Sequence, residues 1–250
     1  MCLVAVRATP FLTAEWRHLV MLSWRIDPDL LAPLVPAGTT LDTWRGAHYV
    51  SLVGFLFLRT RVLGIPVPFH RDFEEVNLRF YVRRALGTEA RRGVCFVREL
   101  VPRLGIAVTA RLAYNEPYVA VPMTHRVEPM VAALNPDRVE YAWRMGRNWS
   151  RMEARPTGES ASVVPGSHEE FITEHYWGYT RQRDGGTVEY HVMHAPWNVR
   201  HIATPIVDGD LTATYGPVFG PILKRAPESA LLASGSPVAV HRPMRVEVIR

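Results

Sequence analysis

Lysine is nearly absent from this chain. Of its 29 basic residues only Lys224 is a lysine, and the other 28 are arginines. Lys224 lies in GPILKRAPES, whose prolines and glycine are typical of a surface turn or short helix, where a lysine is usually solvated. The arginines are scattered without a nucleic-acid-binding motif, so the net charge of +5 does not indicate a nucleic-acid partner. A lysine-dependent mechanism therefore has one weak candidate.

Cysteine and long apolar runs are also scarce. The two cysteines, Cys2 near the N-terminus and Cys95 in an apolar stretch, predict neither a disulfide framework nor a cysteine metal site. No run approaches the roughly 18 to 20 apolar residues that span a bilayer. The start, MCLVAVRATPF, has no basic leader and no room for a signal-peptide core. We therefore expect a cytoplasmic protein without a membrane partner.

The residues that are present indicate a mainly β protein. No internal repeat, low-complexity run or polar linker divides the chain, which predicts a single domain over 1–250 with a sizeable core. Short apolar, often alternating runs between turn residues predict strands. We expect strands over 18–26, 40–44, 49–59, 73–83, 93–100, 119–125, 139–145, 150–155, 176–183, 187–193, 238–241 and 245–249.

The turns favour antiparallel pairing, and helices are few. The Asp-Gly-Gly stretch over 184–186 suits a tight hairpin that needs positive φ. Three short helices are predicted: after the capping Asp27 in IDPDLLAPLVP, after Ser167 in GSHEEFITEHY, where Glu170 completes a capping box, and in PESALLASG, residues 227–235. The segment GIAVTARLAYNEPY is ambiguous between strand and helix.

One predicted strand, within FHRDFEEVNLRFYVRR (residues 69–84), carries polar residues at alternate positions. A period of two places Glu74, Val76, Leu78, Phe80 and Val82 on one face, which we predict to be core. The other face carries Phe73, Glu75, Asn77, Arg79, Tyr81 and Arg83. That polar face is either a salt-bridge ladder open to water or the lining of a pocket, and the pattern alone favours the ladder.

Familiar catalytic motifs are missing. There is no Gly-rich phosphate loop, no Gly-x-Ser-x-Gly elbow and no His-Glu-x-x-His. His191 and His194, followed by His201, form the one histidine cluster, but residues three apart on a strand point to opposite faces, so we expect no metal. Cys95 is a poor nucleophile candidate because an apolar strand raises the pKa of a thiol.

Several long motifs occur in an order that resembles a known family. They are LVPAGTTLDTWRGAHYVSLVGF, VLGIPVPFHRDFEEVNLRFYVRR, YNEPYVAVPM, YGPVFGPIL and GSPVAVHRP, and they resemble the YqjF-like family (DUF2071) from about Trp16 to His241. That family is grouped with the acetoacetate decarboxylase-like superfamily. The resemblance therefore implies a mostly antiparallel β-cone or barrel around a small-molecule cavity. Since a closed barrel has an inside, the resemblance strengthens the pocket interpretation of the polar strand face.

The resemblance also implies roles for individual residues. SWRIDPDLLAPLVP is similar to the start of acetoacetate decarboxylase, so Arg25 matches its substrate-carboxylate arginine, and DFEEVN is similar to its active-site strand, so Glu75 matches its glutamate. In RELVPRLGIAV, Arg103 stands where the decarboxylase has the lysine that forms the Schiff base. An arginine cannot form the iminium, because it is permanently protonated and poorly nucleophilic.

Three function classes follow. The first is an enzyme that uses general acid–base chemistry on a small anionic keto acid or lactone, for example a dehydratase, isomerase or hydrolase, with Glu75 as acid or base, Arg25 as anion anchor and no cofactor. The second, almost equally supported, is a non-catalytic binding or sensing module. The third is a structural or interaction protein with Glu75 open to water, and homo-oligomers are left open in all three. We expect Asn77, Arg79 and Tyr81 to position the ligand, Glu99 to be a second carboxylate at the cavity mouth, and Arg103 to be a further binding residue.

Overall fold

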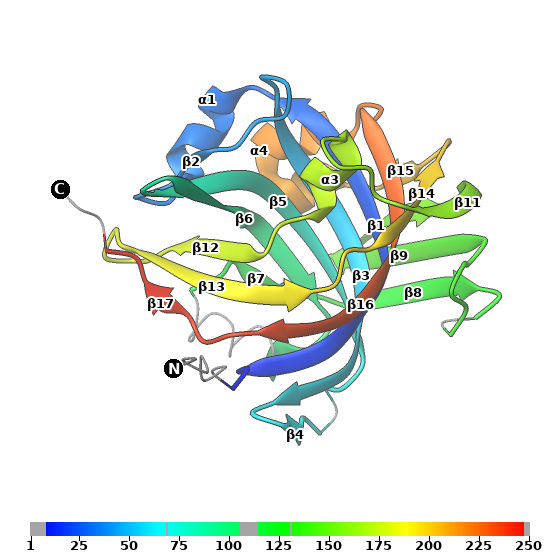
Figure 1. Cartoon of the computed structure of the whole chain (residues 1–250). Helices are drawn as coiled ribbons and strands as arrows, with labels where there is room; N and C mark the ends of the chain where they lie inside the picture. The colour runs from blue at the N-terminus through cyan, green and yellow to red at the C-terminus, as the bar shows by residue number, and fades with distance from the viewer. Residues whose placement is uncertain (1–8, 69, 106–114, 131, 248–250) are drawn as a thin grey trace.

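The computed structural model describes residues 9–68, 70–105, 115–130 and 132–247. Strands dominate it, as the sequence predicts, and a large sheet curls round into a barrel with a smaller sheet and a helix on its outside (Figure 1). No helix within these ranges is both long and apolar enough to cross a bilayer.

Long strands pair side by side until the barrel closes. The order among the described residues is β16–β1–β3–β5–β6–β12–β13, and β13 pairs back with β16. All of these pairings are antiparallel except β6 with β12, which is parallel. The barrel strands are β1 (Leu12–Ile26), β3 (His48–Val62), β5 (Phe73–Leu86), β6 (Glu89–Val101), β12 (Trp177–Arg181), β13 (Thr187–His194) and β16 (Ser229–Val240).

Shorter strands extend this sheet at its margins. Of these, β7 pairs in parallel with β6, while β14 pairs with β16 and carries β11 beyond it. The short strands are β2 (Thr40–Leu41), β4 (Ile65–Pro66), β7 (Tyr118–Ala120), β11 (Pro156–Ser162), β14 (Asn198–Ile202) and β17 (Met244–Arg245).

A second sheet packs on the outer face of the barrel. It is antiparallel and consists of β8 (Met123–Glu128), β9 (Arg138–Met145), β10 (Asn148–Ala154) and β15 (Ile206–Asp208). The helix α4 (Leu211–Leu223) follows β15 in the chain. At Gly54 of β3 a Cβ atom would lie 2.6 Å from Tyr141 Cδ2 and 2.8 Å from Met152 Sδ, so only glycine allows this close approach. The outer faces of β1, β3 and β5 share one apolar core with this sheet and α4.

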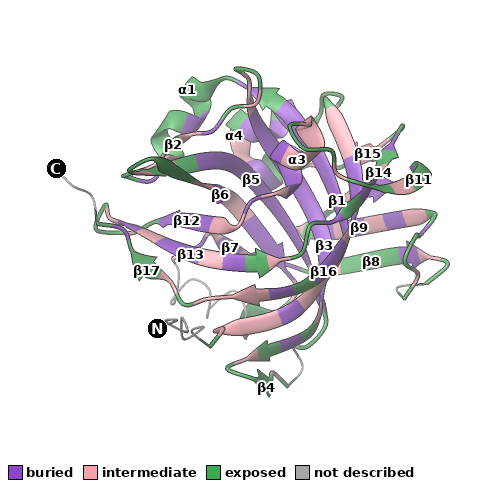
Figure 2. Cartoon of the chain, viewed as in Figure 1, coloured by how far each residue is buried: buried purple, intermediate pink, exposed green. Residues whose placement is uncertain are grey.

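A second apolar cluster fills part of the barrel interior. It includes Met21, Phe55 and Phe73 from the barrel strands, together with Phe171 and Ile172 from α3 (His168–Thr173). Buried residues therefore occupy both faces of the central strands, which are largely purple in Figure 2. The strand over 73–86 thus has no open, wet face along its centre.

Two predicted helices are confirmed and one is wrong. Asp27 caps α1 (Pro28–Leu31), which a 3-10 turn, η1 (Ala32–Leu34), continues, and Ser167 caps α3 by accepting from the Glu170 N–H at 3.2 Å. The helix predicted over 227–235 is instead the first half of β16, because this apolar run pairs with both β1 and β14 and is buried on both faces. Of the ambiguous segment from Gly105, residues 106–114 lie outside the described residues.

The helix α4 is absent from the sequence predictions. Pro217 and Pro221 within its span argue against a helix, and Gly216, at φ 80°, interrupts it with a kink. Its start has an ordinary cap, in which the Asp210 side chain accepts from the Ala213 N–H at 2.9 Å.

Candidate functional site

The polar face of β5 points into the barrel. Glu75, Asn77 and Arg79 are 2%, 3% and 8% exposed, and all three line one interior cavity. On the opposite face Leu78 and Phe80 are fully buried in the outer core, as the period-two pattern predicts. The polar face is therefore a pocket lining, and the water-exposed ladder that the pattern alone favoured is wrong.

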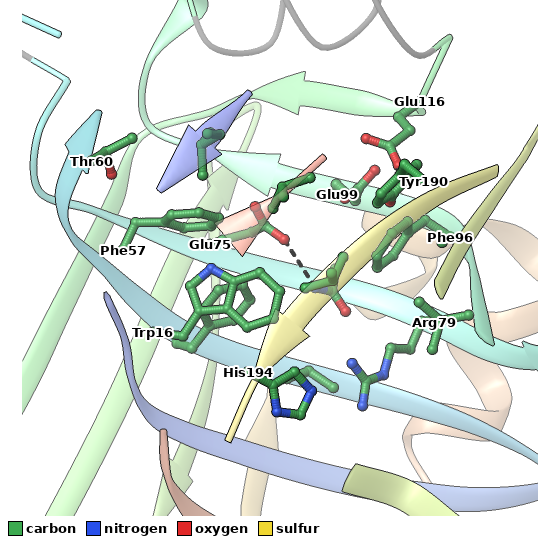
Figure 3. Close-up of a pocket in the computed structure, with 18 of the residues that line it drawn as sticks. Trp16, Phe57, Thr60, Glu75, Arg79, Phe96, Glu99, Glu116, Tyr190 and His194 are labelled. Carbon is green, nitrogen blue, oxygen red and sulfur yellow. Dashed lines mark hydrogen bonds between the residues drawn. The ribbon is translucent and has the colours of Figure 1, made fainter. Parts of the chain in front are cut away.

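The cavity has a volume of about 350 Å³ and a largely aromatic and aliphatic wall. In Figure 3, Trp16 and Phe57 lie on one side of Glu75, while Glu99, Glu116 and Tyr190 lie together on another. Small-molecule sites typically have such a wall, with a few converging polar groups. Apolar and aromatic residues in the lining include Trp16, Leu19, Val53, Phe55, Phe57, Phe73, Val94, Phe96, Val192 and Trp197.

Hydroxyl and amide donors hold two of the three buried carboxyl groups. Asn77 Nδ2 donates to Glu75 Oε1 at 2.9 Å, and the Tyr118 hydroxyl donates to Glu75 Oε2 at 3.0 Å. The Tyr190 hydroxyl donates to Glu116 Oε1. These bonds fix the carboxyl orientations within the wall.

Burial makes these carboxyl groups hard to ionise. It raises the pKa of Glu75 and of Glu116 from 4.5 to about 7. It also raises the pKa of Glu99 well above its ordinary value, and the neighbouring Glu116 and Glu75 carboxylates add to that rise. A carboxyl group with a pKa near neutrality can both accept and release a proton at physiological pH, as a general acid or base must.

Arg79 supplies fixed positive charge to the cavity. It is the only arginine among the described lining residues, and its Nη2 donates to the Ile172 carbonyl at 2.9 Å. Its Nε atom has no hydrogen-bond partner among the described residues. His175 and His194 also line the cavity, but burial lowers the pKa of each, which favours their neutral forms.

Three of the residues predicted from the sequence lie away from the cavity wall. Arg25 is at the end of β1, where its 63% exposed side chain pairs with Glu228 at 2.7 Å. Arg103 is exposed, and neither arginine lines the cavity. Tyr81 is buried behind the wall, where its hydroxyl bonds to Ser51 Oγ at 2.6 Å. Glu99, by contrast, is 1% exposed and lines the cavity beside Asn77, its partner across the strand pair.

Glu116, Tyr118 and Tyr190 are cavity residues that the sequence analysis did not single out. Glu116 and Tyr118 flank Pro117 in YNEPY, one of the motifs that carries the family resemblance, and β7 starts at Tyr118. They reach the cavity because β7 pairs in parallel with β6. This pairing joins separate segments, so it cannot be recognised from the local sequence around Glu116 and Tyr118. Tyr190 comes from β13, on the far side of the barrel closure.

The histidine cluster lies on separate surfaces. His191 stacks on Trp177 at 4.6 Å, whereas His194 faces the cavity and stacks on Trp197 at 4.3 Å. Among the described residues there is no group of three or more His, Cys, Asp or Glu side chains that could hold a metal ion.

The raised pKa of Glu75 predicts a dependence of stability on pH. Between about pH 5 and pH 8 the Glu75 side chain holds more protons in the folded protein than in the unfolded chain, so its contribution to the free energy of unfolding should fall as pH rises. For Glu75, a rise from 4.5 to about 7 corresponds to roughly 2 to 3 kcal/mol. In urea melts, the stability of Glu75→Gln relative to the parent should therefore improve by that amount between these two pH values.

Glu74→Gln is the matched control for this measurement. Glu74 lies on the opposite face of β5. Burial raises its pKa, but the hydrogen bond with His125 Nδ1 at 2.6 Å, a backbone hydrogen bond and nearby positive charge together lower the pKa of Glu74 below its ordinary value. A lowered pKa stabilises the fold above the pKa of the unfolded chain, so this variant should show no gain over the same range. Equal pH profiles for Glu75→Gln and the parent would show that Glu75 is ionised in the folded protein.

The chain matches one family over most of its length. Residues 13–237 match the model of the family DUF2071, described as an uncharacterized conserved protein. Over 224 residues the chain is 26% identical to the "Uncharacterized protein YqjF" of Bacillus subtilis (strain 168), a match that covers 87% of this chain and 88% of that protein.

Solved structures of low sequence identity share the fold. Acetoacetate decarboxylase from Legionella pneumophila superposes with a TM-score of 0.66 at 12% identity, covering 96% of this chain and 88% of that chain. The enduracididine biosynthesis enzyme MppR, complexed with pyruvate, superposes with a TM-score of 0.64 at 14% identity, covering 98% and 93%. The fold is therefore acetoacetate decarboxylase-like, as the sequence resemblance predicts, although two of its strand pairings are parallel.

Proposed function

The chain belongs to the DUF2071 family, and from this premise and the cavity we propose that it binds a small oxo acid and moves a proton on it by general acid–base catalysis. The observation that carries the proposal is that Glu75 and Arg79 lie on the same face of one strand and both line the cavity inside the barrel. Glu75 is a proton carrier with a pKa of about 7, and Arg79 is a fixed cation. The pyruvate bound to the fold neighbour MppR is an oxo acid of the size that this cavity suits.

Arg79 takes the anion-binding role that the sequence analysis gave to Arg25. Arg25 is exposed and paired with Glu228, whereas Arg79 is buried and lines the cavity. A guanidinium group can bind a carboxylate through two parallel N–H donors, and it does so more strongly where water is excluded. The carboxylate of an oxo acid would therefore lie on Arg79.

Glu75 then acts on the carbon next to the oxo group. As a carboxylate it takes a proton from that carbon: the C–H electron pair becomes the new C=C bond, and the π pair of the C=O bond moves onto the oxo oxygen. Glu75, now protonated, gives the proton to that oxygen, which completes the enolisation and restores the carboxylate. Asn77 and Tyr118 hold its two oxygens in place, which keeps the base aligned with its substrate.

A Schiff base does not enter this mechanism. The sole lysine of the chain, Lys224, is the exposed C-cap of α4 and does not line the cavity. A mechanism limited to proton transfer needs no such amine.

A second candidate is a non-catalytic binding or sensing module. The Arg79 anchor and the aromatic wall would serve it equally, and the two candidates differ in whether the bound acid exchanges protons with water. The cytoplasmic location expected from the sequence stays a prediction.

Replacement of Arg79 tests the anion anchor. Arg79→Met should weaken pyruvate binding about 10- to 100-fold in calorimetric titrations, because it removes a charge-assisted hydrogen bond. Arg83→Met is the matched control, because Arg83 lies on the same strand but is exposed and outside the lining. Equal affinity of Arg79→Met and Arg83→Met for pyruvate would contradict the proposed anchor, and Arg79→Lys separates loss of charge from loss of packing.

A further inference from the structure

Among the described residues that line the cavity, carboxyl groups outnumber arginines. The described lining carries three carboxyl groups, on Glu75, Glu99 and Glu116, against the one arginine. Adjacent segments bring them together: Glu99 pairs across the sheet with Asn77 of β5 and with Tyr118 of β7, and Glu116 precedes β7 by two residues. Figure 3 shows Glu99 and Glu116 near each other beside Tyr190, and we call this part of the cavity, defined by Glu99 and Glu116 with the neighbouring amide oxygen of Asn77, the acidic end.

Two hydrogen-bond acceptors at the acidic end have no donor among the described residues. The hydroxyl proton of Tyr118 goes to Glu75 and that of Tyr190 goes to Glu116. Glu99 is 99% buried, and its Oε2 has no hydrogen-bond partner among the described residues; neither does Oδ1 of Asn77, which is 3% exposed. Buried acceptors without donors are costly, so a ligand that supplies N–H groups would be stabilised there.

The arrangement suits an organic cation better than a metal ion. Within the described residues these carboxylates do not form a group that could enclose a metal. Asn77 offers an amide oxygen beside them. Ammonium and guanidinium groups carry three to five N–H donors that can serve several separated acceptors.

We propose that the acidic end binds an ammonium or guanidinium group carried by the same oxo acid whose carboxylate lies on Arg79. This inference rests on the proposed function for its anionic half only. It deepens that function by defining the substrate class as an oxo acid with a positively charged far end. The apolar wall between the two ends would contact the connecting carbon chain.

Cation binding at the acidic end is coupled to proton release. Burial raises the pKa of Glu75 and Glu116 to about 7, so these groups carry protons near neutral pH in the free protein. A bound cation favours their ionised forms and lowers these values. Affinity should therefore rise with pH until about pH 7 is passed, and level off above it. Among the described residues, the titratable groups that face the acidic end are Tyr118 on β7, Tyr190 on β13, Glu75 on β5, and Glu99 and Glu116 themselves. The Arg79 guanidinium on β5 acts electrostatically on Glu75, and the Cys95 thiol on β6, which lies in the outer core, interacts electrostatically with Glu116.

Three small probes test the inference by calorimetry. γ-Aminobutyrate carries both charges, valerate replaces its ammonium group by a methyl group, and butylammonium carries the cation alone. At pH 8, γ-aminobutyrate should bind about 10- to 100-fold more tightly than valerate, the range for a buried charge-assisted hydrogen bond. Titrations near pH 7 in two buffers of different ionisation enthalpy should show proton release with both cationic probes.

Variants locate the effect at the acidic end. Glu99→Gln should remove the preference for γ-aminobutyrate over valerate, and Glu116→Gln serves the same purpose if Glu99→Gln does not fold. Glu89→Gln, at the exposed start of the same strand, should keep the preference. Retention of the full preference in both Glu99→Gln and Glu116→Gln would overturn the inference.

The probes also separate this inference from the proposed function. Equal binding of γ-aminobutyrate and valerate without proton release would overturn the cation site and leave the Arg79 anchor standing. Butylammonium binding that depends on Glu99, with no binding of valerate, would support the cation site and contradict the anchor. Failure of both cationic probes to bind would overturn the inference outright.

Discussion

Replacing Glu75 with glutamine is expected to slow deuterium uptake into the methyl group of pyruvate by about 10²- to 10⁴-fold, the usual contribution of a positioned general base. Glutamine keeps the size of the side chain but cannot accept a proton from carbon. The parent protein should exchange faster as pH rises through about 7, because the ionised form of Glu75 is the base.

The exchange is measured by proton NMR in D₂O, as loss of the methyl signal of pyruvate. Glu74→Gln makes the same chemical change one residue away, on the outer face, and should leave the exchange rate unchanged. If Glu75→Gln exchanges pyruvate as fast as the parent, Glu75 is not the base. If the parent does not exceed the buffer rate, the non-catalytic binding module becomes the better description.

Truncating Phe80 to alanine is expected to lower the free energy of unfolding by about 3 to 5 kcal/mol. Phe80 is fully buried on the outer face of β5, in the core that the barrel shares with the second sheet and α4. Removal of the ring forfeits its transfer free energy and leaves a cavity that rigid strands cannot close. Urea melts measure the loss.

Arg83→Ala is the control for Phe80→Ala. Arg83 lies three residues further along β5 and is exposed, so its truncation should change stability by no more than about 0.5 kcal/mol. Equal urea midpoints for Phe80→Ala and the parent would mean that this face of β5 does not pack against the second sheet.

The two faces of β5 illustrate how far the sequence leads. Alternation alone places Leu78 and Phe80 on one face and Glu75, Asn77 and Arg79 on the other, and the structure has this register. Whether the polar face meets water or a cavity depends on closure of the barrel. Closure depends on pairing between β13 and β16, which are far from β5 in sequence. It therefore cannot be predicted from the alternation of residues within β5.

Other differences have the same physical origin. The run over 229–235 is apolar on both faces, so its periodicity does not separate helix from strand, and pairing with β1 decides the outcome. Glu116 reaches Glu99 only because β7 pairs in parallel with β6. Arg25 was proposed from resemblance to one short motif, yet it lies at an exposed strand end where Glu228 supplies its partner. Local pattern thus predicted elements and faces, and long-range pairing assembled the site.

Glu75→Gln also links stability and function. The buried carboxyl group that is expected to supply the base destabilises the fold once it ionises. The stability of Glu75→Gln relative to the parent should therefore increase with pH, although the variant is less active. Active sites commonly hold such destabilising groups.

A crystal structure of the protein with bound pyruvate tests the central claim most directly. We expect pyruvate inside the barrel, with its carboxylate within hydrogen-bond distance of the Arg79 guanidinium and its methyl carbon facing a carboxyl oxygen of Glu75. Pyruvate bound outside the barrel, or inside it with its carboxylate turned away from Arg79, would contradict the proposed site.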